Sequence, residues 1–462
     1  MEIFEYLKAH TQDILKDIFY AVKIPSVATD GTDEKPYGEK CAEAIDYILS
    51  IAQREGLATR NFDYYAADAT YGSSPEKLGI LTHLDVVPAG EGWVFNPFFM
   101  TERDGKIYGR GVADDKGAAV MSVWALKAIK ELNVPLKHGV RLVFGSGEEV
   151  GCKDLEYYMS KVKMPPYVFS PDASFPIINT EKGRYCGKFD AVYDAYVDGP
   201  QVIRFAGGSI VNVVPRICEA VIRGASEEAL QKALKKFKRL SGIEAKFGFC
   251  GRDIKLTVEG KSAHASMPEN GINAITAMLE LIKLFPLKGK VFEYLKAIND
   301  IFPHGDFYGE KAGVQISDEI SGKSTFSLNI LNCEKGLVSG AFDARTSLNA
   351  TYENTVAPLC DKFKERGIRL QSSDMMPAHH VDGESEFVKL LGKAYEKYTG
   401  NISECVSMGG ITYVHNIENA VAFGPLMPDD DAHIHGANEF MVIDDIIKTT
   451  AIFAQAIIDI CS

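Results

Sequence analysis

Val143-Phe-Gly-Ser-Gly-Glu-Glu-Val-Gly151 is the stretch that decides the fold, because an apolar run leads directly into two adjacent carboxylates, Glu148 and Glu149. The apolar residues predict a buried strand, and paired acids at the end of such a strand need a positive partner. Other strand-like runs of the chain end in acids and His in the same way. Together they predict a hydrolytic metal site at the strand ends of an α/β sheet.

One of these runs is Leu81-Thr-His-Leu-Asp-Val-Val-Pro88, which carries His83 and Asp85 two residues apart. At a strand end the Asp carboxylate can accept one ring N–H of the His, and the other ring nitrogen is then available to a metal ion. Taken alone, the tripeptide favours a simpler interpretation, in which a neighbouring Asp merely satisfies the ring of a His.

A further run, Gly109-Arg-Gly-Val-Ala-Asp-Asp-Lys-Gly117, places Asp114 and Asp115 just before a predicted helix. Asp is well suited to cap a helix, so this pair alone does not distinguish a cap from a metal ligand. In the same way, the two glutamates that follow the 143–151 strand would, by themselves, fit an exposed strand end.

The conjunction with Asp172 and with Asp430-Asp-Ala-His-Ile-His-Gly-Ala-Asn-Glu439 favours the metal site. Zinc and manganese sites draw on His nitrogen and carboxylate oxygen. Two close divalent ions need a bridging carboxylate, terminal ligands for each ion and one spare carboxylate that takes a proton from water. The chain supplies all of these groups.

Strand and helix patterns alternate in the first part of the chain. They predict an amphipathic opening helix over 3–22, a helix over 38–55, a strand over 78–83, a helix over 118–132, and strands over 140–144 and 167–172. This alternation is typical of a doubly wound, mostly parallel α/β sheet, whose functional residues lie beyond the carboxyl ends of the strands.

The pattern changes after about residue 185. Strands at 253–259 and 340–345 mix with helices at 226–240, 271–284 and 352–365 without regular alternation, and the α/β pattern resumes with elements at 385–398, 420–424 and from 443. We therefore predict a discontinuous catalytic metal-binding domain of residues 1–185 and 384–462. An α+β lid domain of residues 186–383, expected to contain two ferredoxin-like units, is inserted in it.

Composition limits the partners of the chain. Its 50 Lys and Arg residues against 63 Asp and Glu give a net charge of −13, and no basic stripe is present, so we expect neither nucleic acid nor a membrane as partner. No apolar run approaches the roughly 20 residues of a membrane span, and no export signal is visible. The nine scattered cysteines fit a reducing compartment, so we expect a cytoplasmic protein.

The motifs resemble those of the dinuclear metallopeptidases, the family of carnosinases, peptidase V, peptidase T, glutamate carboxypeptidases and aminoacylases. The resemblance is greatest to the peptidase V type dipeptidases, and it covers nearly the whole chain. The matching segments, in family order, are His83-Leu-Asp85-Val-Val-Pro, Gly109-Arg-Gly-Val-Ala-Asp-Asp-Lys-Gly, Gly147-Glu-Glu, Ser170-Pro-Asp172 and His435-Gly-Ala-Asn-Glu.

This resemblance implies a role for each residue of the metal site. Asp114 would bridge two metal ions, His83 and Asp172 would complete one site, and Glu149 and His435 the other. The resemblance further implies that Asp85 orients His83 and that Glu148 is the general base. Asp115 competes with Asp114, and His433 with His435; we choose His435 because in the family pattern Asn and Glu follow the ligand three and four residues later.

The resemblance also implies roles for residues of the predicted lid. His264, in Gly260-Lys-Ser-Ala-His-Ala, would donate a hydrogen bond to the substrate carbonyl, and Asn212 and Arg345 would bind the substrate backbone and its terminal carboxylate. Arg suits a carboxylate because its planar fork bonds it bidentately. The loop Ser407-Met-Gly-Gly-Ile-Thr412 is expected to offer N–H groups or the Thr412 hydroxyl to the substrate.

We therefore expect a metallo-dipeptidase that hydrolyses Xaa-Xaa or β-Ala-Xaa dipeptides with water activated between two divalent metal ions. Zn²⁺ is the first choice of metal, and Mn²⁺ or Co²⁺ are alternatives. An aminoacylase, carboxypeptidase or desuccinylase acting on N-acyl amino acids would share this metal site, and a catalytically inactive binding protein is the alternative from another class. The insert is long enough for two α+β units, so the resemblance to peptidase V implies a monomer.

Overall fold

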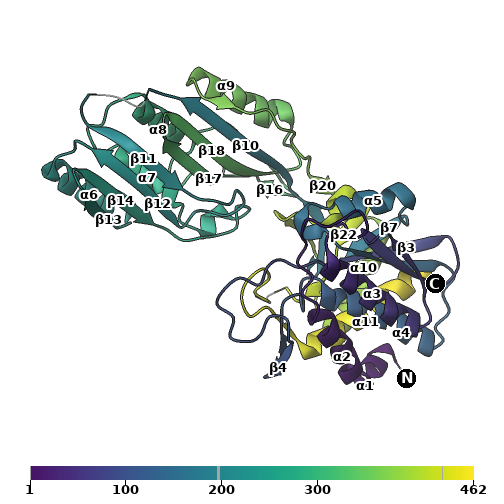
Figure 1. The fold of residues 1–462 in the computed structure, drawn as a ribbon. Coiled ribbons are helices and arrows are strands. Elements are labelled where there is room, and N and C mark those ends of the chain that lie inside the picture. The colour runs from purple at the N-terminus through teal and green to yellow at the C-terminus, as the bar shows by residue number, and fades with distance from the viewer. Residues whose placement is uncertain (1, 195–197, 429) are drawn as a thin grey trace. The chain divides into compact units, whose positions relative to one another are not determined.

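The computed structural model describes residues 2–194, 198–428 and 430–462 of the 462-residue chain. The chain forms two compact units (Figure 1). The first consists of Met1–Thr180, His380–Val406 and Ile411–Ser462, and the second of Glu181–His379 and Ser407–Gly410. The first unit is therefore discontinuous in sequence.

A nine-stranded sheet lies at the centre of the first unit. Its order is β1 (Ala58–Phe62), β2 (Ala66–Tyr71), β6 (Gly139–Gly145), β3 (Glu76–His83), β7 (Tyr167–Ser170), β22 (Ala420–Ala422), β9 (Ile177–Glu181) and β20 (His379–His380), and β21 (Cys405–Met408) also pairs with β9. The neighbours β6, β3, β7 and β22 are parallel, whereas β1 and β2 continue the sheet antiparallel. The predicted α/β fold class is confirmed, and the antiparallel strands beside β6 are an addition to it.

Seven helices of the first unit, among the described residues, surround this sheet: α1 (Ile3–Ala9), α2 (Thr11–Val22), α3 (Glu39–Arg54), α4 (Lys116–Glu131), α5 (Lys153–Lys161), α10 (Glu386–Thr399) and α11 (Ile443–Cys461). Helix α4 packs on β3 and β6 and is itself covered by α2 and α11, which explains why nearly all of its residues are buried. Because apolar side chains there face sheet and helices alike, its sequence is hydrophobic all round.

The single opening helix predicted over 3–22 is wrong, because the structure has two helices that meet at His10. The backbone N–H of His10 donates to the Leu7 carbonyl, and the Thr11 hydroxyl donates to the Lys8 carbonyl. These contacts satisfy carbonyls at the end of α1 and let the chain turn before α2. The apolar spacing alone did not reveal the turn.

The second unit contains one antiparallel sheet of eight strands. The order is β13 (Ala245–Cys250), β14 (Asp253–Glu259), β12 (Ile217–Arg223), β11 (Gln201–Gly207), β17 (Thr325–Glu334), β18 (Leu337–Thr346), β10 (Gly183–Val192) and β19 (Arg369–Leu370). Buried and less buried residues alternate along β12 and β14, so one face of the sheet is covered. All eight strands of the second unit thus belong to one continuous hydrogen-bonded sheet.

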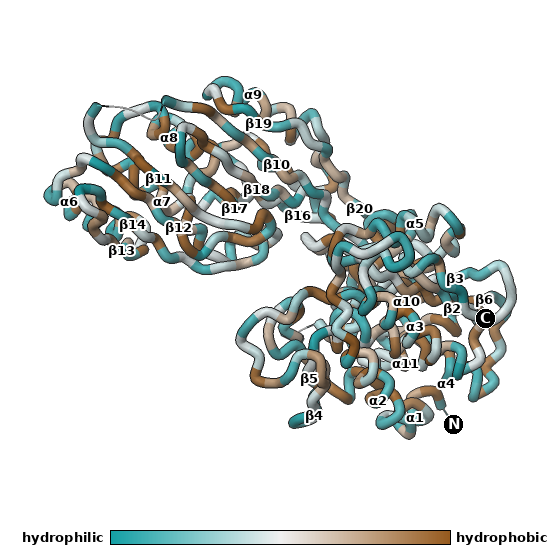
Figure 2. The backbone as a smooth tube through the Cα atoms, viewed as in Figure 1, coloured by the Kyte–Doolittle hydropathy of each residue, from teal (hydrophilic) through white to brown (hydrophobic). Residues whose placement is uncertain are grey.

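Helices α6 (Glu227–Ser241), α7 (Ala274–Ile282), α8 (Lys290–Ile301) and α9 (Ala357–Glu365) contribute to a single hydrophobic core with this sheet. Figure 2 shows the contrast between α7, which is hydrophobic, and α6, which is mostly hydrophilic at the surface. Four Phe rings pack together in this core, stacked in the pairs Phe302–Phe326 and Phe342–Phe363 and tilted or edge-on between the pairs. Aromatic contacts of this kind favour one fixed packing of helices on the sheet.

Three small sheets complete the described structure: β4 (Thr101–Arg103), β5 (Lys106–Tyr108) and β24 (Phe440–Val442) form one, β8 (Ala173–Ser174) and β23 (Pro425–Leu426) another, and β15 (Ser317–Asp318) and β16 (Gly322–Lys323) the third. The pairing of β24 with β5 brings the segment before Phe440 beside the loop after Tyr108. None of the helices in the described part of the chain has the length and apolar character that a membrane span requires.

Candidate metal centre

The carboxyl ends of β3, β6 and β7 meet because these strands are parallel neighbours. His83 is the last residue of β3 and is paired in register with Gly145, the last residue of β6. A single 3₁₀ turn, η1 (Glu148–Val150), follows β6, and Asp172 follows β7. Sequence segments that are far apart therefore place their acids and His at one edge of the sheet, as predicted from the alternation of strands and helices.

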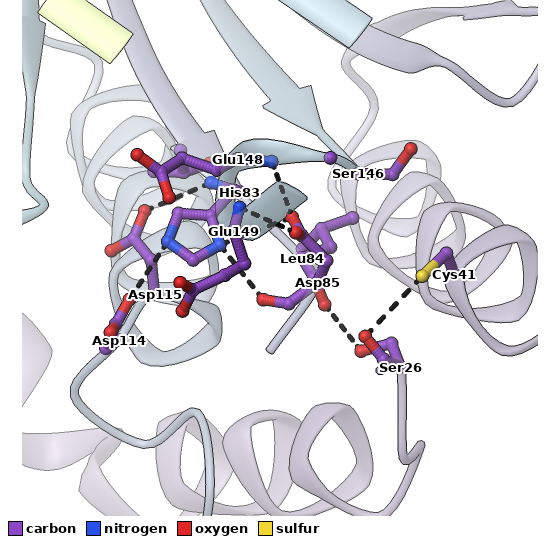
Figure 3. Close-up of polar contacts among 12 residues, drawn as sticks. Ser26, Cys41, His83, Leu84, Asp85, Asp114, Asp115, Ser146, Glu148 and Glu149 are labelled. Carbon is purple, nitrogen blue, oxygen red and sulfur yellow. Dashed lines mark hydrogen bonds and ion pairs between the residues drawn. The ribbon is translucent and has the colours of Figure 1, made fainter. Parts of the chain in front are cut away.

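His83 is fully buried at the centre of this group (Figure 3). Its Nδ1 lies 2.9 Å from the backbone carbonyl oxygen of Asp85, which can only accept, so the ring proton is on Nδ1. Its Nε2 lies 2.9 Å from Oδ1 of Asp114 and 3.8 Å from Oδ1 of Asp172. The ring thus turns its other nitrogen, Nε2, toward two carboxylates, as a metal-ligating His does.

A second His approaches the same carboxylate from the other side. Nε2 of His435 lies 3.0 Å from Oδ2 of Asp114 and 3.1 Å from Oε1 of Glu149. His435 has a φ of 61°, in the left-handed region, so a tight turn before β24 aims this ring at the site. The two oxygens of Asp114 therefore face two different His residues.

These side chains fit two cations. Three groups of residues place ligand atoms within 4.8 Å of one another: His83, Asp114 and Asp172; His83, Glu148 and Glu149; and Asp114, Glu149 and His435. Nε2 of His83 is buried and, among the described residues, has no hydrogen bond of good geometry in spite of its close carboxylates. A buried nitrogen that faces carboxylates without a well-formed hydrogen bond is expected where a metal ion lies between the two.

The electrostatics point the same way. Burial alone would lower the pKa of His83, but the close carboxylates, that of Asp114 first, raise it well above its usual value. Hydrogen bonds to Asp114 and a neighbouring glutamate raise the pKa of His435 to about 10. Burial and the charge of Asp172 raise the pKa of Glu148. Burial is the first cause of the Glu148 shift, but neighbouring negative charge contributes to all three shifts, and divalent cations would neutralise that charge.

Asp85 makes contacts that the sequence did not reveal. Its carboxylate oxygens accept the backbone N–H groups of Glu148 at 3.2 Å and Glu149 at 3.0 Å, while Oδ1 lies 3.4 Å from Nδ1 of His83. Its side chain therefore joins the end of β3 to the turn after β6. Asp85 holds the two glutamates in place, in addition to facing the His that it was predicted to orient.

The competing residues of each pair have different surroundings. Asp115 uses Oδ2 to accept the backbone N–H of His83 at 3.1 Å, whereas the side chain of Asp114 faces both His rings. The ring of His433 packs edge-on against Phe440. The geometry therefore favours Asp114 and His435 as the ligands.

Asp154 and Tyr413 are further residues near the site that the sequence pattern did not single out. Oδ2 of Asp154 accepts the backbone N–H groups of Ser146 and Gly147 and the hydroxyl of Tyr413, whose ring packs edge-on against His83. Both side chains are buried. The Asp154 carboxylate fixes the backbone of Ser146 and Gly147, which leads into the turn with the two glutamates. No local motif marks this pair, because Tyr413 is distant in sequence from both Asp154 and His83.

The predicted substrate-binding residues lie in both units. Thr412, in the first, accepts the backbone N–H of Val414 at the start of a 3₁₀ turn, η4 (Tyr413–Asn416). The other three lie in the second unit. His264 pairs with Val213 as an isolated bridge, which sets the Asn212 and His264 segments side by side.

Arg345 is buried in the second unit, and a carboxylate of its own chain already engages its guanidinium group. Nε and Nη2 donate to Asp343 at 2.7 and 3.5 Å, and Nη1 donates to the Gly409 carbonyl at 2.6 Å. Arg184, opposite Arg345 on β10, donates to the same Asp343. Each Nη atom of Arg345 has a second N–H group beyond these contacts.

Comparison with known proteins identifies the family. Residues 79–459 match the model of peptidase family M20/M25/M40, a range that contains all of the site residues described above. The chain belongs to this family. Its members are metal-dependent peptidases, so the chain is a peptidase hydrolase with a metal site.

Relatives of this M20 family member share its full length. The chain is 33% identical over 454 residues to a putative dipeptidase, YtjP, of Bacillus subtilis, with 97% of each chain covered. It is 33% identical over 461 residues to a β-Ala-Xaa dipeptidase of Lactobacillus delbrueckii, with 99% of this chain and 97% of the relative covered. The structure of human carnosine dipeptidase 1 matches with a TM-score of 0.62, 16% identity and coverage of 99% and 98%, which shows the shared fold.

We predict that the two residues of each competing pair differ in metal binding. Asp114→Ala should abolish binding at both sites, since its oxygens face both His rings, whereas Asp115→Ala should retain metal. His435→Ala should lose one metal ion, and His433→Ala none. Elemental analysis of dialysed protein measures this directly, and equal metal content within either pair would contradict the assignment.

Proposed function

We propose that this family member is a dipeptidase that hydrolyses Xaa-Xaa or β-Ala-Xaa dipeptides at a centre of two divalent metal ions. The observation that carries the proposal is the position of Asp114, whose two carboxylate oxygens lie 2.9 and 3.0 Å from Nε2 of His83 and of His435. Asp172 and Glu149 complete the two ligand sets. The full-length likeness to a β-Ala-Xaa dipeptidase supports the choice of substrate.

The metal ions, when bound, would polarise the peptide carbonyl and lower the pKa of water to near neutrality. Glu148 is assigned the role of general base, which takes a proton from the attacking water and passes it to the leaving amine. It is the carboxylate left over once Glu149 has been assigned to a ligand set, and the Asp85 carboxylate fixes its backbone. Asp85 is assigned to orient the ring of His83.

The residues of the second unit are assigned to the substrate. His264 would donate to the carbonyl oxygen as negative charge develops on it, and the neighbouring Asn212 would hold the substrate backbone. Arg345 would bind the terminal carboxylate through the N–H groups that Asp343 leaves available. Thr412, in the first unit, is the remaining substrate contact that we propose.

The proposal includes the metal, partners and location. Zn²⁺ is assigned first and Mn²⁺ or Co²⁺ second, since carboxylate and imidazole ligands accept all three. The partner is a small peptide rather than nucleic acid or a membrane, which the net charge of −13 supports. The scattered cysteines are consistent with a cytoplasmic enzyme, and we propose that the enzyme works as a monomer.

A substrate panel tests the proposed activity. The protein reconstituted with Zn²⁺, Mn²⁺ or Co²⁺ should hydrolyse dipeptides, lose this activity with a chelator and regain it on addition of metal. N-acyl amino acids are the control substrates, because an aminoacylase has the same metal ligands. Faster turnover of N-acyl amino acids than of any dipeptide would favour the acylase alternative, and chelator-resistant hydrolysis would refute a metal mechanism.

Glu148→Gln should lower kcat by about 10²–10⁴ while both metals stay bound, because the amide cannot accept the proton. Glu149→Gln is the matched control, since it changes the adjacent residue in the same way but should reduce metal content instead. Kinetics and elemental analysis of both variants separate the roles. Near-normal turnover in Glu148→Gln, or equal metal content in the two variants, would show that the assignment is wrong.

Mixing two inactive variants tests whether each chain works alone. Glu148→Gln inactivates the metal centre of the first unit, and His264→Ala removes the proposed donor of the second. In a monomer both molecules stay inactive after mixing. Recovery of dipeptidase activity in the mixture would mean that His264 acts on the metal centre of another chain, and the proposal of a monomer would be wrong.

A further inference from the structure

Glu439 is a completely buried carboxylate that the proposed mechanism does not use. Its Oε1 accepts three backbone N–H groups of one loop: Gly111 at 2.9 Å, Ala113 at 3.0 Å and Asp114 at 3.2 Å. A carboxylate that collects several N–H groups fixes the backbone that carries them. The last of these three residues is the proposed bridging ligand.

Arg110 balances the charge of this carboxylate. Its Nη1 donates to Oε2 of Glu439 at 2.6 Å, and its Nη2 donates to the carbonyl oxygens of Gly436 at 3.0 Å and Ala89 at 3.4 Å. The guanidinium group is buried, and it lies over the ring of Trp93, 5.3 Å from its centroid. Arg110 therefore joins two distant segments, 88–93 and 436–439, to its own loop.

Each of these segments carries groups of the metal centre. Ala89 lies six residues after His83 in the loop that follows β3, Gly436 follows His435 directly, and the loop of Arg110 itself contains Asp114. The ion pair thus lies where the ligand segments of both proposed metal ions meet. Burying two opposite charges costs desolvation energy, so a buried ion pair is weak evidence for a gain in protein stability. A role in positioning these segments therefore explains the presence of the pair more specifically.

We infer that the Arg110–Glu439 ion pair is a positioning device of the metal centre, which sets the distance between the Asp114 carboxylate and the two His rings. It touches neither metal nor substrate and acts through the loop that it holds. The inference rests on the proposed dinuclear centre and adds residues that determine its metal affinity. Partners that orient metal ligands in this way typically contribute about 10–100-fold to metal affinity.

Metal titration of the full-length chain tests the inference. Glu439→Gln keeps an oxygen for the three N–H groups but removes the charge that Arg110 faces. We expect Zn²⁺ to bind this variant about 10–100-fold more weakly than the parent in competition with a chromogenic chelator. The visible absorption of bound Co²⁺ should change as well, because it reports ligand geometry, while the far-ultraviolet circular dichroism stays that of the parent.

Asp17→Asn is the matched control. Asp17 is also a buried carboxylate, paired with Arg54 at 2.7 Å and with the indole N–H of Trp124 at 2.8 Å, but it contacts none of the ligand segments. This variant should bind Zn²⁺ like the parent. Metal affinity within twofold of the parent in Glu439→Gln, or an equal loss in Asp17→Asn, would overturn the inference.

Two further measurements keep the test decisive. If Glu439→Gln does not fold, Arg110→Lys takes its place under the same criterion, since it retains the charge and loses the fork. Dipeptide hydrolysis is measured separately. A parent that binds two metal ions without hydrolysing dipeptides refutes the proposed function alone, whereas an active Glu439→Gln variant with unchanged affinity refutes this inference alone.

Discussion

The carboxylate of Asp114 faces His83 with one oxygen and His435 with the other, and the rest of the first unit is arranged around this geometry. Buried charges are tolerated only when they are paired, and here several carboxylates share two His rings. The raised pKa values of both rings express that excess of negative charge. Bound metal would neutralise this charge, which agrees with membership of a family of metal-dependent peptidases.

Three features of the fold bring these charged side chains together. The parallel strands β3, β6 and β7 end at one edge and present His83, the glutamates and Asp172 without long loops. His435 comes from the far end of the chain, and the pairing of β24 with β5 places its segment beside the loop of Asp114. Side chains such as Asp85 then tie the loops together through backbone N–H groups, so the ligands are held by partners distant in sequence.

The second unit differs in architecture from the first. Its antiparallel sheet and four helices, within the described residues, share one hydrophobic core that does not depend on a metal. Asp343 joins Arg184 and Arg345 on adjacent strands, so a fixed pair of guanidinium groups replaces two mobile ones. Side chains that are fixed in this way lose less conformational freedom on binding, and the proposed role of Arg345 toward a substrate carboxylate relies on this.

The sequence by itself determined the fold class, the metal-dependent peptidase family and the cluster of acids and His, because strand periodicity and short motifs are local and the strand-end rule brings them together. It also favoured Asp114 over Asp115 and His435 over His433, but only through resemblance. The turn at His10, the hold of Asp85 on the two glutamates, and the Asp154 and Glu439 networks were decided by tertiary structure alone. The hydrogen bonds of Asp85 and Glu439 join residues tens to hundreds of positions apart, and no local pattern encodes such partners. The contacts at His10 and those of Asp154 to the turn after β6 are short in range, but the spacing of apolar residues does not encode them either.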